Sequence, residues 1–577
     1  MPKWTPFVAA LLAATTPVWA EEALSGDATR EYLLDDVPSL PTVLRDQWSA
    51  TVPTDAFERE RGHYGRLGDS AAPRPITLAE CIGLALENNT GLRVAKLTPI
   101  AAANAVRSAY AQFDPAAFAN TNKSRNKLPV STISAFTNDN SNESFDQAIN
   151  WNAGIGKRLV TGAALNAEWT NQRLSSDPNV VNQLVPAYYT GLNLSLNQPL
   201  LRDFGWRFSL LVVDVAQIGE AASLHDYEAA VATLIENVER AYWTYVLAIE
   251  SVRVEEKGLD LAKELLRQNA GRFNVGALPR TMVLESEAEV ARREAQLVTS
   301  RALQRIARDN LRALINAKDE AAQELIMIEP ADQPTMVPTD LDLDRSLAVA
   351  YEQRPELLAA RLDVDGSRVQ RKIAENALLP RFDFVGSIGL AGLGGDAANV
   401  PPNQIGVPNP HVLGGYDRSL ELLTDGRYYQ YLVGARIEIP IANAGAKAQY
   451  AQAKVNAEAA RLGLEQLEED VTREITQAVN NLKALVTSIQ ATRVARELAE
   501  ENVRNQQARF DVGLATTKDL IDFTERLTQA ERQEVQSLAT YNIELARLYF
   551  SRGTLLSERH VALESAVPEE APWWAQF

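Results

Sequence analysis

The stretch RFNVG at residues 272–276 occurs again as RFDVG at residues 509–513. Each copy interrupts two long polar-and-aliphatic runs that contain hardly a proline. Two such breaks, far apart in one chain, predict two turns at which long helices reverse direction. The chain is therefore predicted to contain a duplicated helical hairpin.

The sequence on the N-terminal side of these breaks is also duplicated. ITLAECIGLAL, from Ile76, matches LDLDRSLAVAY, from Leu341. Thr77 and Asp342 fall at equivalent places, each a good N-cap for a short helix. Each half is predicted to contain a short helix, a second helix, strands, a very long helix, the break and a further long helix.

The long helices give the strongest structural signal. Residues 446–510 contain no proline and a single glycine, and at about 1.5 Å per residue they would extend on the order of 100 Å. Their apolar positions form one continuous stripe: Leu464, Leu467, Val471, Ile475, Ala478, Leu482, Leu485 and Ile489. The aligned stripe is Tyr227, Ala230, Leu234, Val238, Ala241, Tyr245, Ala248 and Val252. An ordinary helix-bundle core would explain the stripes but neither the length nor the duplication.

Strands are predicted between the helices, because apolar and polar residues alternate there. GLNLSLNQP and VGARIEIPI form a matched pair, each ended by a proline. The apolar faces comprise Leu192, Leu194 and Leu196, and Val433, Ala435, Ile437 and Ile439. Further candidates begin at Phe382 and, more weakly, after Phe113. An added β-hairpin over residues 144–173 would explain why the first half is longer, and LAGLG at residues 390–394 is predicted to be a loop.

The N-terminus predicts export. MPKWTPFVAALLAATTPVWA has a positive charge at Lys3, an apolar stretch and a small-residue cleavage site ending at Ala20. The alternative is an amphipathic helix of the mature protein. The net charge of −18 argues against a nucleic-acid partner, and the single cysteine, Cys81, excludes an internal disulfide.

No later apolar run is long enough for a transmembrane helix. If the chain enters a membrane, it must therefore do so as a closed β-barrel. Too few strands are predicted to close a wide barrel alone, so several copies would share one. The apolar strand faces would then contact lipid. A half-buried sheet in a soluble domain is the alternative.

An enzyme is not expected. The four histidines are scattered without metal-ligand spacing, and no nucleophile-elbow or phosphate-loop motif is present. Neither a cofactor nor a metal is predicted.

The sequence resembles the TolC family of outer-membrane efflux and secretion channels. The resemblance runs from Ile76 to about Leu556 and rests on ITLAECIGLALENN, its repeat LDLDRSLAVAYEQRPEL, the strand ending IEIPIANAG, and RFDVGLATTKDLIDFTE. It implies a mainly α fold with β structure, in which duplicated helical hairpins form a trimeric periplasmic α-barrel and strands contribute to a shared outer-membrane β-barrel. Each chain would give four or six strands. The location implied is the outer membrane of a Gram-negative bacterium, with a large periplasmic part.

The resemblance also implies partners and functional residues. The homotrimer would dock a periplasmic adaptor, itself coupled to an inner-membrane transporter, and would serve a tripartite efflux pump or type I secretion. The adaptor-docking residues would be Val275, Gly276, Ala277, Val512, Gly513 and Leu514. Asp519 and Asp522 match acidic residues of the closed periplasmic entrance. Met282 departs from this pattern in the first half, so an acidic ring is expected to draw mainly on the second.

Two alternatives remain open. Asp519 and Asp522 could simply be a solvated face near a helix start, where acidic residues favour the helix dipole. The chain could also be a soluble periplasmic coiled-coil adaptor or scaffold, although such a protein would carry one helical hairpin.

The predicted organisation runs as follows: a signal peptide (1–20), an extended N-terminal segment (21–75), a first repeat (76–318, tip 272–282), a linker (319–340), a second repeat (341–556, tip 509–522) and a C-terminal tail (557–577).

Overall fold

The computed structural model describes residues 74–129, 143–176, 184–316, 327–337, 339–398 and 409–562. All of them belong to one compact unit of the chain. The predicted signal peptide, residues 21–73 of the N-terminal segment and residues 563–577 of the tail lie outside the described residues.

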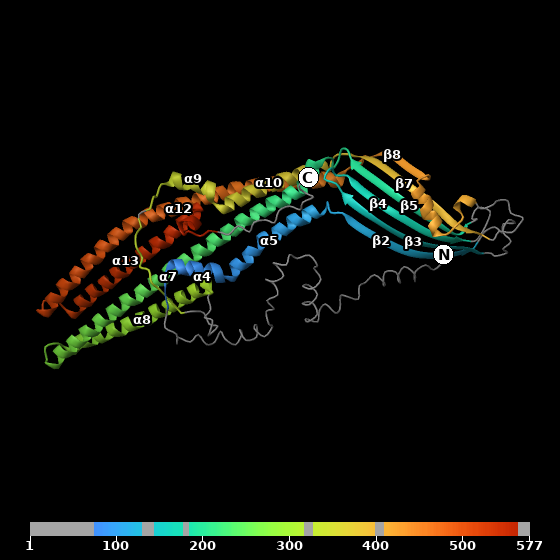
Figure 1. Ribbon diagram of the computed structural model, residues 1–577. Helices are drawn as coiled ribbons and strands as arrows, with labels where there is room; N and C mark the ends of the chain where they lie inside the picture. Colours follow the sequence, from blue (N-terminus) through green and yellow to red (C-terminus); the bar gives the residue numbers. More distant parts are fainter. Residues whose placement is uncertain are drawn as a thin grey trace, which may run out of the picture. The chain divides into compact units, whose positions relative to one another are not determined.

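The first half contains four helices of the predicted kinds (Figure 1). They are α4 (Leu78–Asn88), α5 (Thr90–Ala111), α7 (Leu211–Asn274) and α8 (Arg280–Ile315). Thr77 is the N-cap of α4 as predicted, and its hydroxyl accepts a hydrogen bond from the Glu80 amide in a complete capping box. A one-turn helix, α6 (Trp206–Ser209), precedes α7.

The second half repeats this order. It contains α9 (Leu343–Gln353), α10 (Pro355–Asn376), α12 (Ala444–Asp511) and α13 (Thr517–Arg552). Asp342 caps α9 as predicted, by accepting from the Asp344 amide. The 68 residues of α12 form one unbroken helix of about 100 Å. A 3-10 turn, η2 (Pro410–Val412), and two short helices, α11 (Tyr416–Asp425) and α14 (Leu555–Glu558), complete the described helices.

Six strands form one antiparallel sheet in the order β2-β3-β4-β5-β7-β8. They are β2 (Ala116–Pro129), β3 (Glu143–Arg158), β4 (Ala164–Ser176), β5 (Leu184–Pro199), β7 (Arg381–Ala397) and β8 (Tyr429–Glu438). The sheet of one chain therefore contains six strands, whereas the sequence had left open whether each chain would have four or six. The antiparallel pair β3 and β4 covers the stretch predicted as an added hairpin.

The prediction of a loop at residues 390–394 is wrong, because these residues lie inside β7. Their glycines serve the close approach of α11 to the sheet. A Cβ atom at Gly392 would lie 1.9 Å from the Ser419 carbonyl oxygen, and one at Gly394 would lie 2.5 Å from that of Gly415. Helix α11 was not predicted.

The predicted linker between the halves also contains a strand. β6 (Ile328–Pro330) pairs in parallel with β1 (Arg74–Ile76), at the start of the first repeat. The Tyr242 hydroxyl lies 2.8 Å from Asp332 Oδ2 and 3.2 Å from the Ile76 carbonyl oxygen. The chain therefore returns to its starting point before the second repeat begins.

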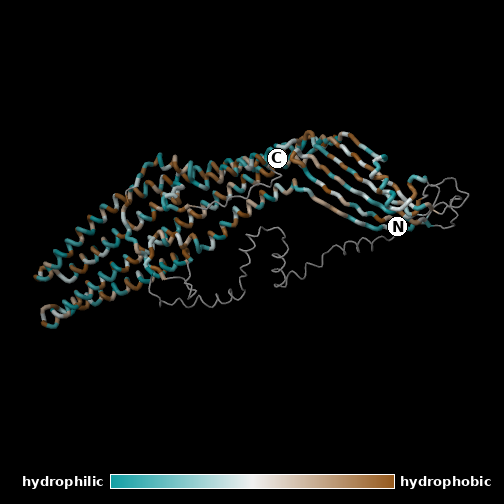
Figure 2. The backbone as a smooth tube through the Cα atoms, in the orientation of Figure 1, coloured by the Kyte–Doolittle hydropathy of each residue, from teal (hydrophilic) through white to brown (hydrophobic). Residues whose placement is uncertain are grey.

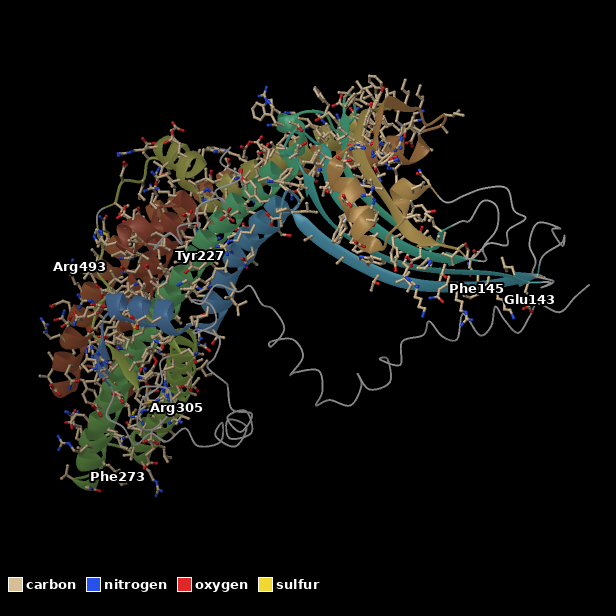
Figure 3. All side chains as sticks on the ribbon, turned by 45° about the vertical axis from the view of Figure 1, so that its right-hand side comes forward. Glu143, Phe145, Tyr227, Phe273, Arg305 and Arg493 are labelled. Atoms are coloured by element: carbon tan, nitrogen blue, oxygen red, sulfur yellow. The ribbon has the colours of Figure 1, made fainter. Side chains whose placement is uncertain are left out.

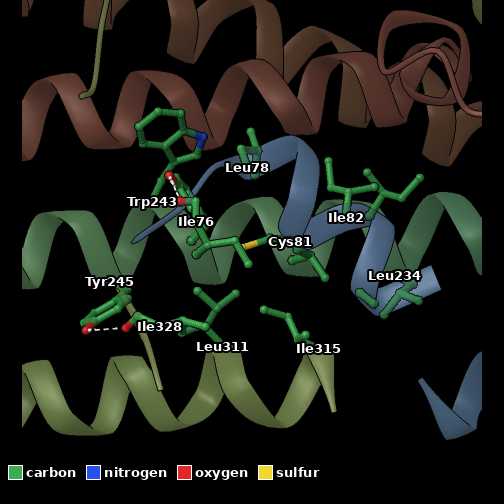
Figure 4. Close-up of a cluster of buried hydrophobic side chains, with 14 of the residues drawn as sticks. Ile76, Leu78, Cys81, Ile82, Leu234, Trp243, Tyr245, Leu311, Ile315 and Ile328 are labelled. Carbon is green, nitrogen blue, oxygen red and sulfur yellow. Dashed lines mark hydrogen bonds between the residues drawn. The ribbon is translucent and has the colours of Figure 1, made fainter. Parts of the chain in front are cut away.

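A hydrophobic core surrounds this junction (Figure 4). Ile76, Cys81 and Leu311 are fully buried in it, together with side chains from α7. Burial raises the pKa of the Cys81 thiol to about 12. The corresponding core of the second half contains the whole predicted stripe of α12, from Leu464 to Ile489.

Candidate functional site: helix tips and sheet faces

The two RF-VG breaks are identical helix-terminating turns. The Gly276 amide donates to the Phe273 carbonyl and the Ala277 amide to the Arg272 carbonyl, the two bonds of a Schellman motif. Gly513 and Leu514 make the same two bonds to Phe510 and Arg509. Both glycines have φ of +78°, in the left-handed region that favours glycine.

The residues predicted to dock a partner are exposed at these turns. Val275 is 79% exposed, and Val512 and Leu514 are each 71% exposed. Ala277 is also exposed. Phe273, at the end of the first hairpin, points outward in Figure 3. Each tip therefore presents apolar side chains to solvent, as a docking surface would require.

Arg272 joins the two tips, a role that the sequence analysis missed. Its guanidinium lies 4.6 Å from the centre of the Phe510 ring and 3.7 Å from the Asp511 carboxylate. It also donates a 3.4 Å hydrogen bond to the Phe510 carbonyl. Arg272 is the first residue of RFNVG and so belongs to a motif that the sequence singles out. Its role could not be predicted, because its partners Phe510 and Asp511 belong to the other repeat.

Asp519 and Asp522, the acids predicted to line the entrance, have different surroundings. Asp519 accepts hydrogen bonds from the Thr516 amide and hydroxyl, at 2.9 and 2.7 Å, and completes a capping box for α13. These bonds lower its pKa. Asp522, one turn later, is exposed.

The first repeat also has an acid at this level. Glu285 is exposed on α8, one turn after Met282, as Asp522 follows Asp519 on α13. The offset that relates Gly276 to Gly513 also relates Glu285 to Asp522, so the sequence contained the signal.

Further from the tips, buried charges connect α7, α8 and α13. Arg293 donates to Glu289 at 2.7 Å, and Glu255 lies between Arg293 and Arg532. Arg293 and Glu255 are only 3% and 2% exposed. On the surface beside them, Arg292 makes a double hydrogen bond to Glu525 at 2.9 and 3.1 Å. The two hairpins are thus fastened together by charged groups.

In the half of the sheet nearer the long helices, one face is mainly apolar, and hydropathy alternates along the strands in Figure 2. Further along the same face, β2 carries Lys123 and Arg125, and α11 packs on Thr190. Leu194 lies opposite Ile388, which lies opposite Tyr431, so the apolar band is continuous across three strands. The exposed members of this band are Ile155, Trp169, Leu192, Leu194, Ile388, Tyr431, Val433 and Ile437. Ala435 and Ile439 are exposed as well, whereas Leu196 is half-buried.

The opposite face carries amide and hydroxyl groups. Asn193 lies opposite Glu168, and Ser195 opposite Asn166. None of the helices in the described part of the chain has the length and hydropathy of a membrane-spanning helix.

Long hairpins with exposed tips, combined with a sheet that carries an exposed apolar band, are the features of a channel protein that joins a membrane barrel to a helical tunnel. The model of the outer membrane efflux protein family matches residues 81–317 and 347–554. The chain belongs to this family, as the resemblance implied, and is located in the outer membrane. It is the outer-membrane channel of an efflux or type I secretion system, and the soluble scaffold is not favoured.

Relatives and solved structures agree with this assignment. The outer membrane protein TolC of Salmonella enteritidis is 26% identical over 424 residues, which cover 72% of this chain and 78% of the relative. The alkaline protease secretion protein AprF of Pseudomonas aeruginosa is 25% identical, covering 63% and 69%. The CmeC outer membrane channel of Campylobacter jejuni superposes with a TM-score of 0.58 at 18% identity, covering 83% and 86%.

Proposed function

We propose that three copies of this chain close one β-barrel in the outer membrane and one helical tunnel below it. The observation that carries this proposal is the open sheet. Within the described residues, its edge strands β2 and β8 have no partner beyond β3 and β7, and both are exposed along nearly all their length. Open edges invite pairing with another chain, and closure into a barrel removes them.

The exposed apolar band would contact lipid in this assembly. Leu192, Leu194 and Leu196 of β5 and the alternating residues Val433 to Ile439 of the β8 segment supply it. The amide-rich face would line the water-filled lumen.

The oligomer is tested by electrophoresis of outer-membrane fractions. The expected result is a heat-modifiable band of three chains that converts to monomer on boiling. A chain recovered only from the soluble periplasmic fraction would contradict the proposal and favour the scaffold.

The two tips dock a periplasmic adaptor protein, which couples the channel to an inner-membrane transporter. The support is the pair of identical turns with exposed Val275, Val512 and Leu514. Val275→Asp combined with Val512→Asp should abolish export, because each charge would lose hydration in an apolar contact. Trimer assembly should be unchanged. Normal export by this variant would rule out docking through the tips.

Acidic residues near the tips narrow the closed entrance and favour cations. Asp522 and Glu285 are exposed at matching places, whereas the Asp519 carboxylate also caps α13. Asp522→Asn with Glu285→Gln should reduce the cation selectivity of single channels in a planar bilayer. Glu287→Gln, an exposed acid on the same helix, is the control. Equal selectivity in all variants would exclude an acidic entrance.

A further inference from the structure

The sheet has six strands, but only four of them are joined directly to a long helix. α5 leads into β2, β5 into α7, α10 into β7, and β8 into α12. α7 packs against α5 and α10, and α10 packs against α12, so these four helices follow the order of their strands. β3 and β4 lie between β2 and β5, and neither is followed or preceded directly by a helix.

The β3–β4 hairpin is a full part of the sheet. β3 pairs with β2 without interruption from Glu143 to Gly156. β4 pairs with β5 from Ala164 to Leu174. β4 also alternates in step with β5, because Trp169 lies opposite Leu192 and Glu168 lies opposite Asn193.

The turn of the hairpin is anchored where the sheet meets α7. The Gly205 amide donates to the Thr161 carbonyl at 3.2 Å, and Ala163 is 1% exposed. Gly162 has φ of +88°, and a Cβ atom there would lie 2.5 Å from the Asp203 carbonyl oxygen. Only glycine fits this turn, so the hairpin is fixed at the base of the sheet.

The added strands bring the sheet to the width of the helical layer. Four helices side by side, each about 10 Å across, span roughly 40 Å. Six strands about 4.8 Å apart and tilted by about 40° span roughly 38 Å of a barrel circumference, whereas four would span only about 25 Å.

We propose that the β3–β4 hairpin widens the outer-membrane pore. Resting on the trimer proposed above, three such sheets close a barrel of about 18 strands, a size that leaves an aqueous channel. The barrel therefore sets no narrow limit on the size of the cargo.

The lumen face indicates the chemical class of the cargo. Side-chain amides recur on this face across β2 to β5, and Asn150 donates to Asn122 at 2.7 Å. The other amides on this face are Asn120, Asn126, Asn152, Asn166, Gln172, Asn193 and Asn197, and the charged Arg158 and Glu168 lie among them. A wide wall rich in amides suits bulky hydrophilic cargo better than a small apolar solute.

Electron microscopy of the full chain in lipid nanodiscs tests the strand number. The expected barrel has six strands from each of three copies. A trimer whose barrel lacks β3 and β4 would overturn the inference and leave the proposed function intact. A different oligomer would overturn the proposed function itself.

Pore width is tested with a lumen cysteine, Asn193→Cys, because the native Cys81 is buried. Maleimide polymers of increasing mass are added to intact cells. Deletion of residues 143–176, which joins β2 to β5, should lower the largest reactive mass by about 2-fold or more, since barrel width grows with strand number. Leu192→Cys, on the lipid face, is the matched control. An unchanged mass limit would contradict the inference. If the deletion variant fails to assemble, the number of strands seen by electron microscopy in the full chain tests the inference instead.

Discussion

The two tip glycines are the residues on which the hairpin turns depend most directly. Gly276 and Gly513 share a φ of +78°, and a Cβ atom at either would meet open space. The need for glycine is therefore conformational and not steric. An L-residue with a side chain in this region costs about 1–2 kcal/mol.

Gly513→Ala should therefore loosen the last turn of α12 by about 1 kcal/mol. The measurement is hydrogen exchange of the amides preceding the tip, which should become faster. Gly463→Ala is the control, since Gly463 lies within α12 with open space around it and alanine favours the helix. It should slow exchange locally. Equal effects of the two substitutions would contradict a conformational role for Gly513.

The Asp519 carboxylate makes the start of α13 sensitive to acid. Its folded pKa is lowered, first by the hydrogen bond from the Thr516 amide and next by that from the Thr516 hydroxyl. A lowered folded pKa means that the stabilisation is complete above the unfolded value of about 3.9 and is lost as pH falls through the folded value. The first turn of α13 should therefore fray below about pH 4.

A nitroxide label at the exposed Lys518→Cys reports this change, and the buried Cys81 leaves the labelling selective. Label mobility should rise as pH falls below about 4. In an Asp519→Asn background, mobility should be insensitive to pH over the same range. An identical pH response in both backgrounds would assign the effect to another group.

At the scale of elements, the two hairpins are held together by charges as well as by apolar contacts. Glu255 is buried between Arg293 and Arg532, and the Arg293 side chain is equally buried. An unpaired buried charge costs about 3–5 kcal/mol, but Arg293 would keep Glu289 as a partner at 2.7 Å if Glu255 were removed, so the cost should be smaller.

Glu255→Ala should therefore destabilise the contact of α7 with α8 and α13 by about 1–2 kcal/mol. The measurement is the thermal midpoint of the purified protein, which should fall. Glu255→Leu combined with Arg293→Met should recover much of the loss, because it replaces charge by apolar volume. Arg532 stays solvated, since its side chain is 43% exposed. No recovery in the double variant would mean that packing alone explains the effect.

The elements that were predictable from the sequence are those whose signal is local. The α12 stripe from Leu464 to Ile489 repeats at helical spacing over many turns, so both the helix and its buried face follow from the pattern. The alternation in β5 and the N-cap at Thr77 are equally local signals. The order of six strands could not be read in this way, because pairing depends on contacts between distant residues.

The features that the sequence did not predict also depend on contacts between distant residues. Leu390–Gly394 resembles a loop until α11 is known to pack on Gly392 and Gly394. Arg272 has an ordinary position in its own hairpin, and its partner Phe510 belongs to the other. In each case the residue's role depends on a contact with a segment that is distant in the sequence.

For the whole molecule, the orientation of the sheet decides which face meets lipid. Leu192 and Asn193 are neighbours in β5 and point to opposite faces, and their opposite residues in β4 are Trp169 and Glu168. One position lies in the apolar band and the other on the amide face. Arginine at the first would have to enter the membrane, at about 2–4 kcal/mol near the midplane.

Leu192→Arg should therefore reduce the fraction of chains that reach the heat-modifiable form in outer-membrane fractions. Asn193→Arg, which places the same side chain in the lumen and opposite Glu168, should assemble normally. The two variants differ by one position and have the same added charge, so composition cannot explain a difference between them. Equal assembly of both would show that this face does not meet lipid, and a defect in Asn193→Arg alone would reverse the orientation of the sheet.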